Sequence, residues 1–194
     1  MQPQLKEKLQ SFKGLILDGD GVWFTGEEFR GILPGGDALI IKSRYHQDSQ
    51  GLAFMRALGS HVLFATAEGK PLQSIVEKLN NLPSARSGDW TPISVLTDFK
   101  SAGEKVEAIE KWLRQRQLNW SQCAYIGDDR SDYEAMMKIN TEGGLSATPG
   151  NGQRLIRKIA QILLTKPGGG GAIREFAEMV LDARGVDEAT LAFA

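Results

Sequence analysis

Short apolar runs alternate with longer amphipathic segments along the chain. Runs of strand length lie at 15–17, 61–65, 94–96, 124–126, 144–147 and 159–164. Segments with helical periodicity lie between and after them, at 51–58, 71–80, 102–117, 132–139, 152–158 and 172–183. In the third of these, Val106, Ile109 and Leu113 recur at the spacing of one helix face, and glycine or proline marks most junctions. The alternation predicts an α/β layered fold with a central, mainly parallel sheet.

Two segments interrupt this alternation. Residues 22–42 carry five glycine or proline residues between short β-prone pieces, which predicts a hairpin-like flap over one end of the sheet. Residues 82–97 contain Pro83, Gly88 and Pro92 and predict an irregular surface excursion. The 194 residues suit a single domain over 1–194, in which a glycine-rich motif, a helix and a tail form residues 166–194.

Composition and charge narrow the classes of function. The 23 Lys and Arg residues balance 24 Asp and Glu residues, so the chain lacks the basic field typical of a nucleic-acid-binding protein. Cys123 is the one cysteine, and the N-terminal "MQPQLKEKLQ" has no apolar signal region, so we expect a reducing, cytoplasmic setting. Because no apolar run reaches the roughly 20 residues of a membrane helix, we expect no membrane partner. Small polar substrates fit this composition.

Candidate chemistry follows three of the predicted strands. Asp18 and Asp20 form "DGDG" directly after the first run, Thr66 follows the run at 61–65, and "GDDRSD" follows the run at 124–126. Lys105 lies near the start of the long helical segment at 102–117. Taken alone, "DGDG" is most often a capped turn, and "GDDRSD" is about as often a helix N-cap as a functional site. The carboxyl ends of parallel strands meet at one edge of a sheet, however, and ligands bind there.

These groups form a set suited to phosphate chemistry. Close carboxylates repel one another and lose solvation when buried, so they need a cation or a shared proton. Mg²⁺ takes one or two protein carboxylates together with substrate phosphate. Thr66 supplies a hydrogen bond to a phosphate oxygen, and Lys105 neutralises charge that develops in the transition state. The pattern therefore predicts a Mg²⁺-dependent phosphoryl-transfer site.

The motifs "LDGDGVW", Thr66, Lys105 and "GDDRSD" resemble, in order and spacing, the four motifs of the haloacid dehalogenase superfamily of phosphohydrolases. The chain is most similar to the branch that contains octulosonate 8-phosphate phosphatases, nonulosonate 9-phosphate phosphatases and the C-terminal domain of some acylneuraminate cytidylyltransferases. "DSQGLAFM" and "PGGGGAIREFAEMVL" resemble two further motifs of this branch. The resemblance implies a Rossmannoid three-layer sandwich with a small β-hairpin flap, no large cap domain, and assembly as a homotetramer.

The resemblance also implies roles for individual residues. Asp18 is the expected nucleophile that forms an aspartyl-phosphate, and Asp20 is expected to protonate the leaving sugar oxygen and later to activate water. Thr66 and Lys105 complete the implied catalytic set. The implied Mg²⁺ ligands are Asp18, the main-chain carbonyl of Asp20, and Asp128, supported by Asp129 and Asp132.

Three positions depart from the pattern of the octulosonate enzymes. Residues 66–68 read Thr-Ala-Glu where those enzymes commonly have Thr-Gly-Arg, residues 47–49 read Gln-Asp-Ser in place of Arg-Asp-Gly, and Gly170 stands where their tail usually carries arginine. The first two departures resemble phosphatases that act on nine-carbon ulosonates. We therefore expect a nine-carbon ulosonate phosphate to be favoured over an eight-carbon one. The expected substrate-binding residues are Asp48, Glu68 and Lys70.

Two other functions use the same residues. A noncatalytic oligomerisation or regulatory module related to the cytidylyltransferase domain is the main alternative, and a phosphotransferase or phosphate sensor is another. The chain keeps the motif acids and Lys105, which favours the enzyme. For Trp23 and Phe24, packing is favoured over substrate contact.

Overall fold

The computed structural model describes residues 2–67 and 69–191, without the side chain of Lys70. Its centre is a six-stranded parallel sheet with the strand order β5-β4-β1-β6-β7-β8. The strands are β1 (Gly14–Leu17), β4 (His61–Ala65), β5 (Ser94–Leu96), β6 (Cys123–Ile126), β7 (Leu145–Thr148) and β8 (Ile162–Leu163). The predicted α/β fold with a parallel sheet is confirmed.

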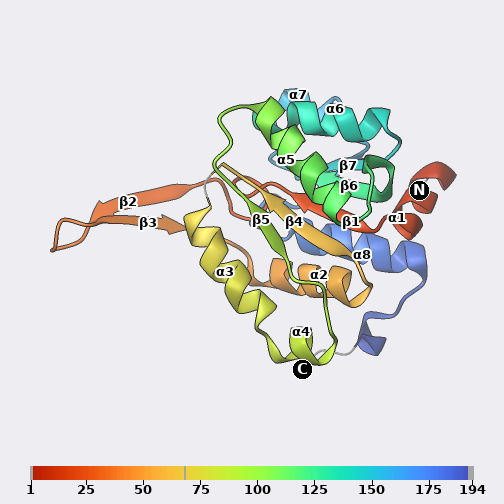
Figure 1. Cartoon of the computed structure of the whole chain (residues 1–194), viewed down its shortest axis with the longest axis horizontal. Coiled ribbons are helices and arrows are strands. Elements are labelled where there is room, and N and C mark those ends of the chain that lie inside the picture. The colour runs from red at the N-terminus through yellow and green to blue at the C-terminus, as the bar shows by residue number, and fades with distance from the viewer. Residues whose placement is uncertain (1, 68, 192–194) are drawn as a thin grey trace.

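Helices cover both faces of this sheet (Figure 1). One layer contains α1 (Pro3–Ser11), α2 (His46–Ala57), α3 (Lys70–Asn80) and α8 (Ala172–Arg184). The other contains α5 (Ala102–Gln115), α6 (Tyr133–Thr141) and α7 (Arg154–Arg157). Short 3₁₀ segments lie at Trp120–Gln122, Arg130–Asp132 and Glu188–Thr190. The three-layer arrangement matches the one that the sequence predicts.

The central strand β1 is apolar because both of its faces are covered. Leu15 and Leu17 pack into the core on the α2 and α8 side, whereas Ile16 points to the α5 and α6 side, and each is fully buried. A strand buried on both faces reads as a continuous apolar run rather than an alternating one. This is why the polar residues that follow Leu17 stand out as a site.

Several expected boundaries are wrong. The excursion expected at 82–97 contains a short helix, α4 (Pro83–Ser87), which begins on a proline because the missing N–H costs nothing at a first helical position. Helix α1 was not expected, since its apolar positions lie among charged residues and only Leu9 is fully buried. The run at 159–164 forms a strand over Ile162–Leu163 alone, and α2 begins at His46, earlier than expected.

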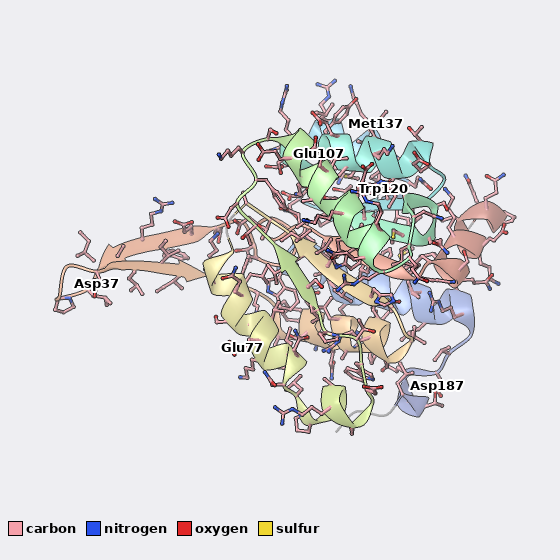
Figure 2. All side chains as sticks on the ribbon, in the orientation of Figure 1. Asp37, Glu77, Glu107, Trp120, Met137 and Asp187 are labelled. Carbon is pink, nitrogen blue, oxygen red and sulfur yellow. The ribbon has the colours of Figure 1, made fainter. Side chains whose placement is uncertain are left out.

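The predicted flap is a two-stranded antiparallel hairpin of β2 (Glu28–Ile32) and β3 (Ala38–Lys42), in which Glu28 pairs with Lys42 at the base. It extends well beyond the body of the molecule, with Asp37 near its tip (Figures 1 and 2). Its apolar side chains are exposed: Phe29, Ile32, Leu33, Leu39, Ile40 and Ile41. The hairpin therefore presents apolar surface to its surroundings.

The expected start of the flap at residue 22 is wrong. Trp23 is fully buried, and its ring packs edge-on against Phe64 with 5.3 Å between ring centroids. Val22 and Phe24 are buried as well. The aromatic pair belongs to the core, which confirms packing for Trp23 and Phe24. Among the described residues, no helix is both long and apolar enough to cross a lipid bilayer.

Candidate active site

Three adjacent strands deliver the predicted site residues to one edge of the sheet. Asp18 follows β1, Thr66 follows β4, and Asp128 lies two residues after β6. Leu17 is in register with both Phe64 and Ile126, so the three strand ends lie at the same level. This is the edge at which open parallel sheets bind ligands.

Lys105 lies in the first turn of α5 and joins two of the acids. Its side chain is 4% exposed, and its Nζ lies 2.8 Å from Asp18 Oδ1 and 2.7 Å from Asp132 Oδ1. Burial by itself lowers the pKa of the ammonium, but Tyr125, Asp132 and Asp18 together raise that pKa well above its usual value. Lys105 is therefore a fixed positive charge beside the predicted nucleophile.

The carboxylates of this site are crowded and poorly solvated. Burial, followed by the charge of Asp132, raises the pKa of Asp18 to about 7, although the Lys105 charge opposes the shift. Burial and the charges of Asp132 and Asp18 raise the pKa of Asp128 to about 8. Both shifts mean that the site stabilises a bound positive charge.

The donor set fits a Mg²⁺ ion. One carboxylate oxygen from each of Asp18, Asp128 and Asp132 lies within 4.8 Å of the others, and Asp128 Oδ1 is buried without a hydrogen-bond partner. Both carboxylate oxygens of Asp132 already accept hydrogen bonds. Its Oδ1 accepts from Lys105 Nζ and from the Tyr125 hydroxyl, each at 2.7 Å, and its Oδ2 accepts from the backbone N–H of Asp128 at 2.9 Å. Asp18 and Asp128 are thus the carboxylates available to a cation, and Asp132 holds Lys105 and the 127–129 turn in place.

Asp129 has a local structural partner. It is the N-cap of the 3₁₀ segment Arg130–Asp132, and its Oδ1 accepts the backbone N–H of Ser131 at 2.7 Å. Its expected support of the metal site stays a prediction.

The glycines of the "DGDG" turn allow neighbouring side chains to pack closely against its backbone. A Cβ at Gly21, whose φ is +77°, would overlap the Asp128 carboxylate, and a Cβ at Gly19 would lie 2.5 Å from Thr66 Oγ1. Asp128 and Thr66 therefore lie directly against the turn that carries Asp18 and Asp20. The turn has no room for side chains at these two positions.

The glycine-rich segment near the C-terminus supports the other side of this turn. Gly169 donates its N–H to Val22 O at 2.8 Å, and a Cβ at Gly168 would overlap Gly21 O. Asn151 bridges the two segments, since its Nδ2 donates to Gly21 O at 3.0 Å and its Oδ1 accepts from Gly168 N at 2.7 Å. Sequence reasoning missed Asn151, because one asparagine in "TPGNGQ" resembles any loop residue.

Asp48 has a structural role at the start of α8. Its side chain is fully buried, Oδ2 accepts the Gly171 N–H at 3.1 Å, and Oδ1 accepts the Arg174 N–H at 2.9 Å. It caps the start of α8 and fixes the glycine-rich segment, and its expected contact with substrate stays a prediction. Burial, opposed by these backbone hydrogen bonds, raises the pKa of the carboxyl.

Asp20 has a partner that sequence reasoning did not find. Lys42, the last residue of β3, donates from Nζ to both carboxylate oxygens of Asp20, at 2.9 and 2.7 Å. No spacing rule connects the end of a hairpin with the turn after β1, so only the fold brings the two together. Of the other expected substrate residues, Glu68 lies outside the described residues, and Lys70 is described only as the first residue of α3.

Two cavities open beside the strand ends. One of about 190 Å³ is lined by Lys105 together with Ala67, Lys100, Ser101 and Ser131, among others. The other, of about 500 Å³, lies between the hairpin and the start of α3, with lining residues that include Leu39, Ile40, Ala67, Pro71 and Asp98. Ala67 borders both cavities, so the two lie next to each other.

Comparisons with known proteins show what the chain is similar to. No family model matches the chain. The 3-deoxy-D-manno-octulosonate 8-phosphate phosphatase of Haemophilus influenzae is 25% identical over 181 residues, which cover 93% of this chain and 89% of that protein. N-acylneuraminate cytidylyltransferase B of Danio rerio is 27% identical over 151 residues, which cover 77% of this chain but 31% of the relative, so the chain spans about a third of that protein.

A solved structure has the same fold. It is the 3-deoxy-D-manno-octulosonate 8-phosphate phosphatase of Moraxella catarrhalis, in complex with a magnesium ion, a phosphate ion and a KDO molecule. The two structures superpose with a TM-score of 0.74 and 24% sequence identity, over 95% of this chain and 94% of that one.

Proposed function

We propose that this chain, which belongs to the haloacid dehalogenase superfamily in the branch of the octulosonate 8-phosphate phosphatases, hydrolyses a sugar-acid phosphate monoester through an aspartyl-phosphate on Asp18. Its class is that of the phosphoric monoester hydrolases and its cofactor is Mg²⁺. The observation that carries the proposal is the contact of Lys105 with Asp18, beside an Asp128 oxygen that has no partner.

Each residue has a chemical task in this proposal. An oxygen of Asp18 attacks phosphorus while the bond from phosphorus to the sugar oxygen breaks, and Asp20 gives its proton to that oxygen. Asp20 then takes a proton from the water that attacks the phospho-enzyme, which releases inorganic phosphate and restores Asp18. Lys105 and the Thr66 hydroxyl stabilise the phosphoryl oxygens throughout.

Asp18, Asp128 and the main-chain carbonyl of Asp20 are the proposed ligands of Mg²⁺. The bound ion supplies positive charge to the phosphoryl oxygens. The raised pKa values of Asp18 and Asp128 support this assignment, since a cation relieves the repulsion that raises them.

The proposed substrate is a nine-carbon ulosonate 9-phosphate rather than the eight-carbon ester. Glu68 and Gly170 stand at positions where the octulosonate enzymes commonly carry arginine, so this chain would contact the sugar through different groups at these two positions. Glu68, tempered by Lys70, would accept hydrogen bonds from the additional hydroxyl groups. The cavity of about 500 Å³ next to Ala67 has room for the longer chain.

The hairpin supports assembly as a homotetramer. Phe29 is 63% exposed, Ile32 80% and Ile41 51%, and apolar residues on an isolated two-stranded hairpin gain stability from a neighbouring subunit. A cytoplasmic location belongs to the same proposal.

The function is tested by kcat/KM for the eight-carbon and nine-carbon ulosonate phosphates and for p-nitrophenyl phosphate, each with Mg²⁺ and with excess chelator. We expect Mg²⁺-dependent turnover of all three, a preference for the nine-carbon ester, and a shift of that preference toward the eight-carbon ester in Glu68→Arg. Absence of Mg²⁺-dependent turnover would favour the noncatalytic module. An eight-carbon preference, or a ratio that Glu68→Arg leaves unchanged, would contradict the specificity alone.

A further inference from the structure

The end of the hairpin holds a buried lysine against the proposed acid and base. The Lys42 side chain is 4% exposed, whereas that of Asp20 is 42% exposed. Both Asp20 oxygens accept from the same ammonium, at 2.9 and 2.7 Å. The carboxylate is therefore held from one side and open to solvent on another.

The hairpin base fixes the ammonium in turn. Glu28, opposite Lys42 in the antiparallel register, places a carboxylate oxygen 3.9 Å from Nζ. Nζ also lies 5.8 Å from the centroid of the buried Phe24 ring. A backbone hydrogen bond of 3.0 Å from Thr25 N to Ser43 O closes the base of the hairpin. The position of Lys42 thus follows from the position of the hairpin.

We propose that Lys42 is a positioning residue for Asp20, which makes proton transfer to the leaving group depend on the base of the hairpin. This rests on the proposed function, in which Asp20 protonates the sugar oxygen. A proton is delivered efficiently only when the acid lies within about 2.6–3.2 Å of its acceptor, and an exposed aspartate without a partner samples several rotamers. The hydrogen bonds from Lys42 hold the Asp20 side chain in one rotamer.

The pairing is compatible with both protonation states of Asp20. When Asp20 is protonated, its carbonyl oxygen still accepts a hydrogen bond from Lys42, and when Asp20 is ionised, both oxygens accept. The same contact therefore holds the group while it gives its proton to the sugar oxygen and while it takes one from water. Lys42 itself neither gains nor loses a proton.

The test compares two leaving groups. A sugar alkoxide leaves phosphorus poorly without a proton, whereas p-nitrophenolate leaves without one. In Lys42→Met, kcat/KM for octulosonate 8-phosphate should fall about 10- to 100-fold, and kcat/KM for p-nitrophenyl phosphate should stay within about threefold. Lys42→Arg should recover much of the loss, because a guanidinium also pairs with both oxygens of a carboxylate. Lys6→Met, at an exposed position of α1, is the matched control for the substitution itself.

A double-mutant cycle separates positioning from other roles. In the Asp20→Asn background, Lys42→Met should cause little further loss of kcat/KM for octulosonate 8-phosphate. Equal losses for both substrates in Lys42→Met, or a full additional loss in the Asp20→Asn background, would overturn the proposal, because a structural role or a direct substrate contact gives those results. If Lys42→Met does not fold, Lys42→Gln takes its place in both experiments. A wild-type protein that is inactive on both esters would refute the proposed function instead. Wild-type activity is therefore measured before the variants are compared.

Discussion

Lys105→Met probes the electrostatics of the site without touching the sheet. In the intact protein the buried ammonium pairs with Asp18 at 2.8 Å and Asp132 at 2.7 Å. Removing one partner of a buried ion pair leaves uncompensated charge and costs about 3–5 kcal/mol of unfolding free energy. Methionine keeps a similar length of side chain, so the loss reports the charge more than the packing.

The cost should depend on pH, because Asp18 can take up a proton. The pKa of Asp18 is about 7 with Lys105 opposing the upward shift, so removal of Lys105 raises that pKa further. Above about pH 7 the folded variant then holds a proton that the folded wild type has released. A folded state that binds more protons loses stability as the pH rises, by up to about 1.4 kcal/mol per pH unit here. The stability difference should therefore be larger at pH 8.5 than at pH 6, by up to about 2 kcal/mol.

The assay is urea unfolding in excess chelator at these two pH values. Wild type, Lys105→Met and Lys111→Met are compared, the last being an exposed position of the same helix. Lys111→Met should change the unfolding free energy by less than about 0.5 kcal/mol at either pH. A Lys105→Met loss that is equal at both pH values, or smaller at pH 8.5, would refute the reasoning about Asp18.

Three further predictions address other parts of the account. Asp128→Ala should weaken the apparent affinity for Mg²⁺, so that phosphatase activity is partly recovered at higher Mg²⁺ concentration; activity independent of Mg²⁺ would contradict the assignment. Asp48→Ala should lower the unfolding free energy by about 1–3 kcal/mol for each buried N–H left without a partner, with little change in KM, whereas a raised KM at unchanged stability would favour a direct substrate contact instead. Ile32→Lys combined with Ile40→Lys should give a species smaller than a tetramer by light scattering, and a wild type that is monomeric at all concentrations would remove the proposed role of the hairpin.

The sheet and the clustering of the candidate site residues at one edge could be predicted from local patterns. Runs such as 61–65 are apolar because both faces of a parallel sheet are buried, and the acids after β1 and β6 depart from that pattern sharply. The carboxyl ends of parallel strands lie at the same edge of a sheet. Asp18 and Asp128 could therefore be expected at one edge without knowledge of the strand order. These features carry their signal within a few residues of sequence.

Other features could not be predicted because they depend on long-range approach. The pair of Lys42 with Asp20 joins the end of the hairpin to the turn after β1. Asn151 contacts Gly168, which is 17 residues away along the chain, and Gly21, which is 130 residues away. Asp48 accepts hydrogen bonds from the start of α8, more than 120 residues away along the chain, and no local pattern indicates this contact.

The central claim is that the phosphoryl group is carried by Asp18, and trapping the phospho-enzyme tests it most directly. Asp20→Asn should still accept phosphate from ³²P-labelled p-nitrophenyl phosphate with Mg²⁺, since this leaving group needs no proton, but it should hydrolyse the aspartyl-phosphate slowly. We expect acid-quenched Asp20→Asn to retain label that hydroxylamine removes, and Asp18→Asn to retain none and to release no phosphate. Label on Asp18→Asn, or continued turnover by that variant, would contradict the account.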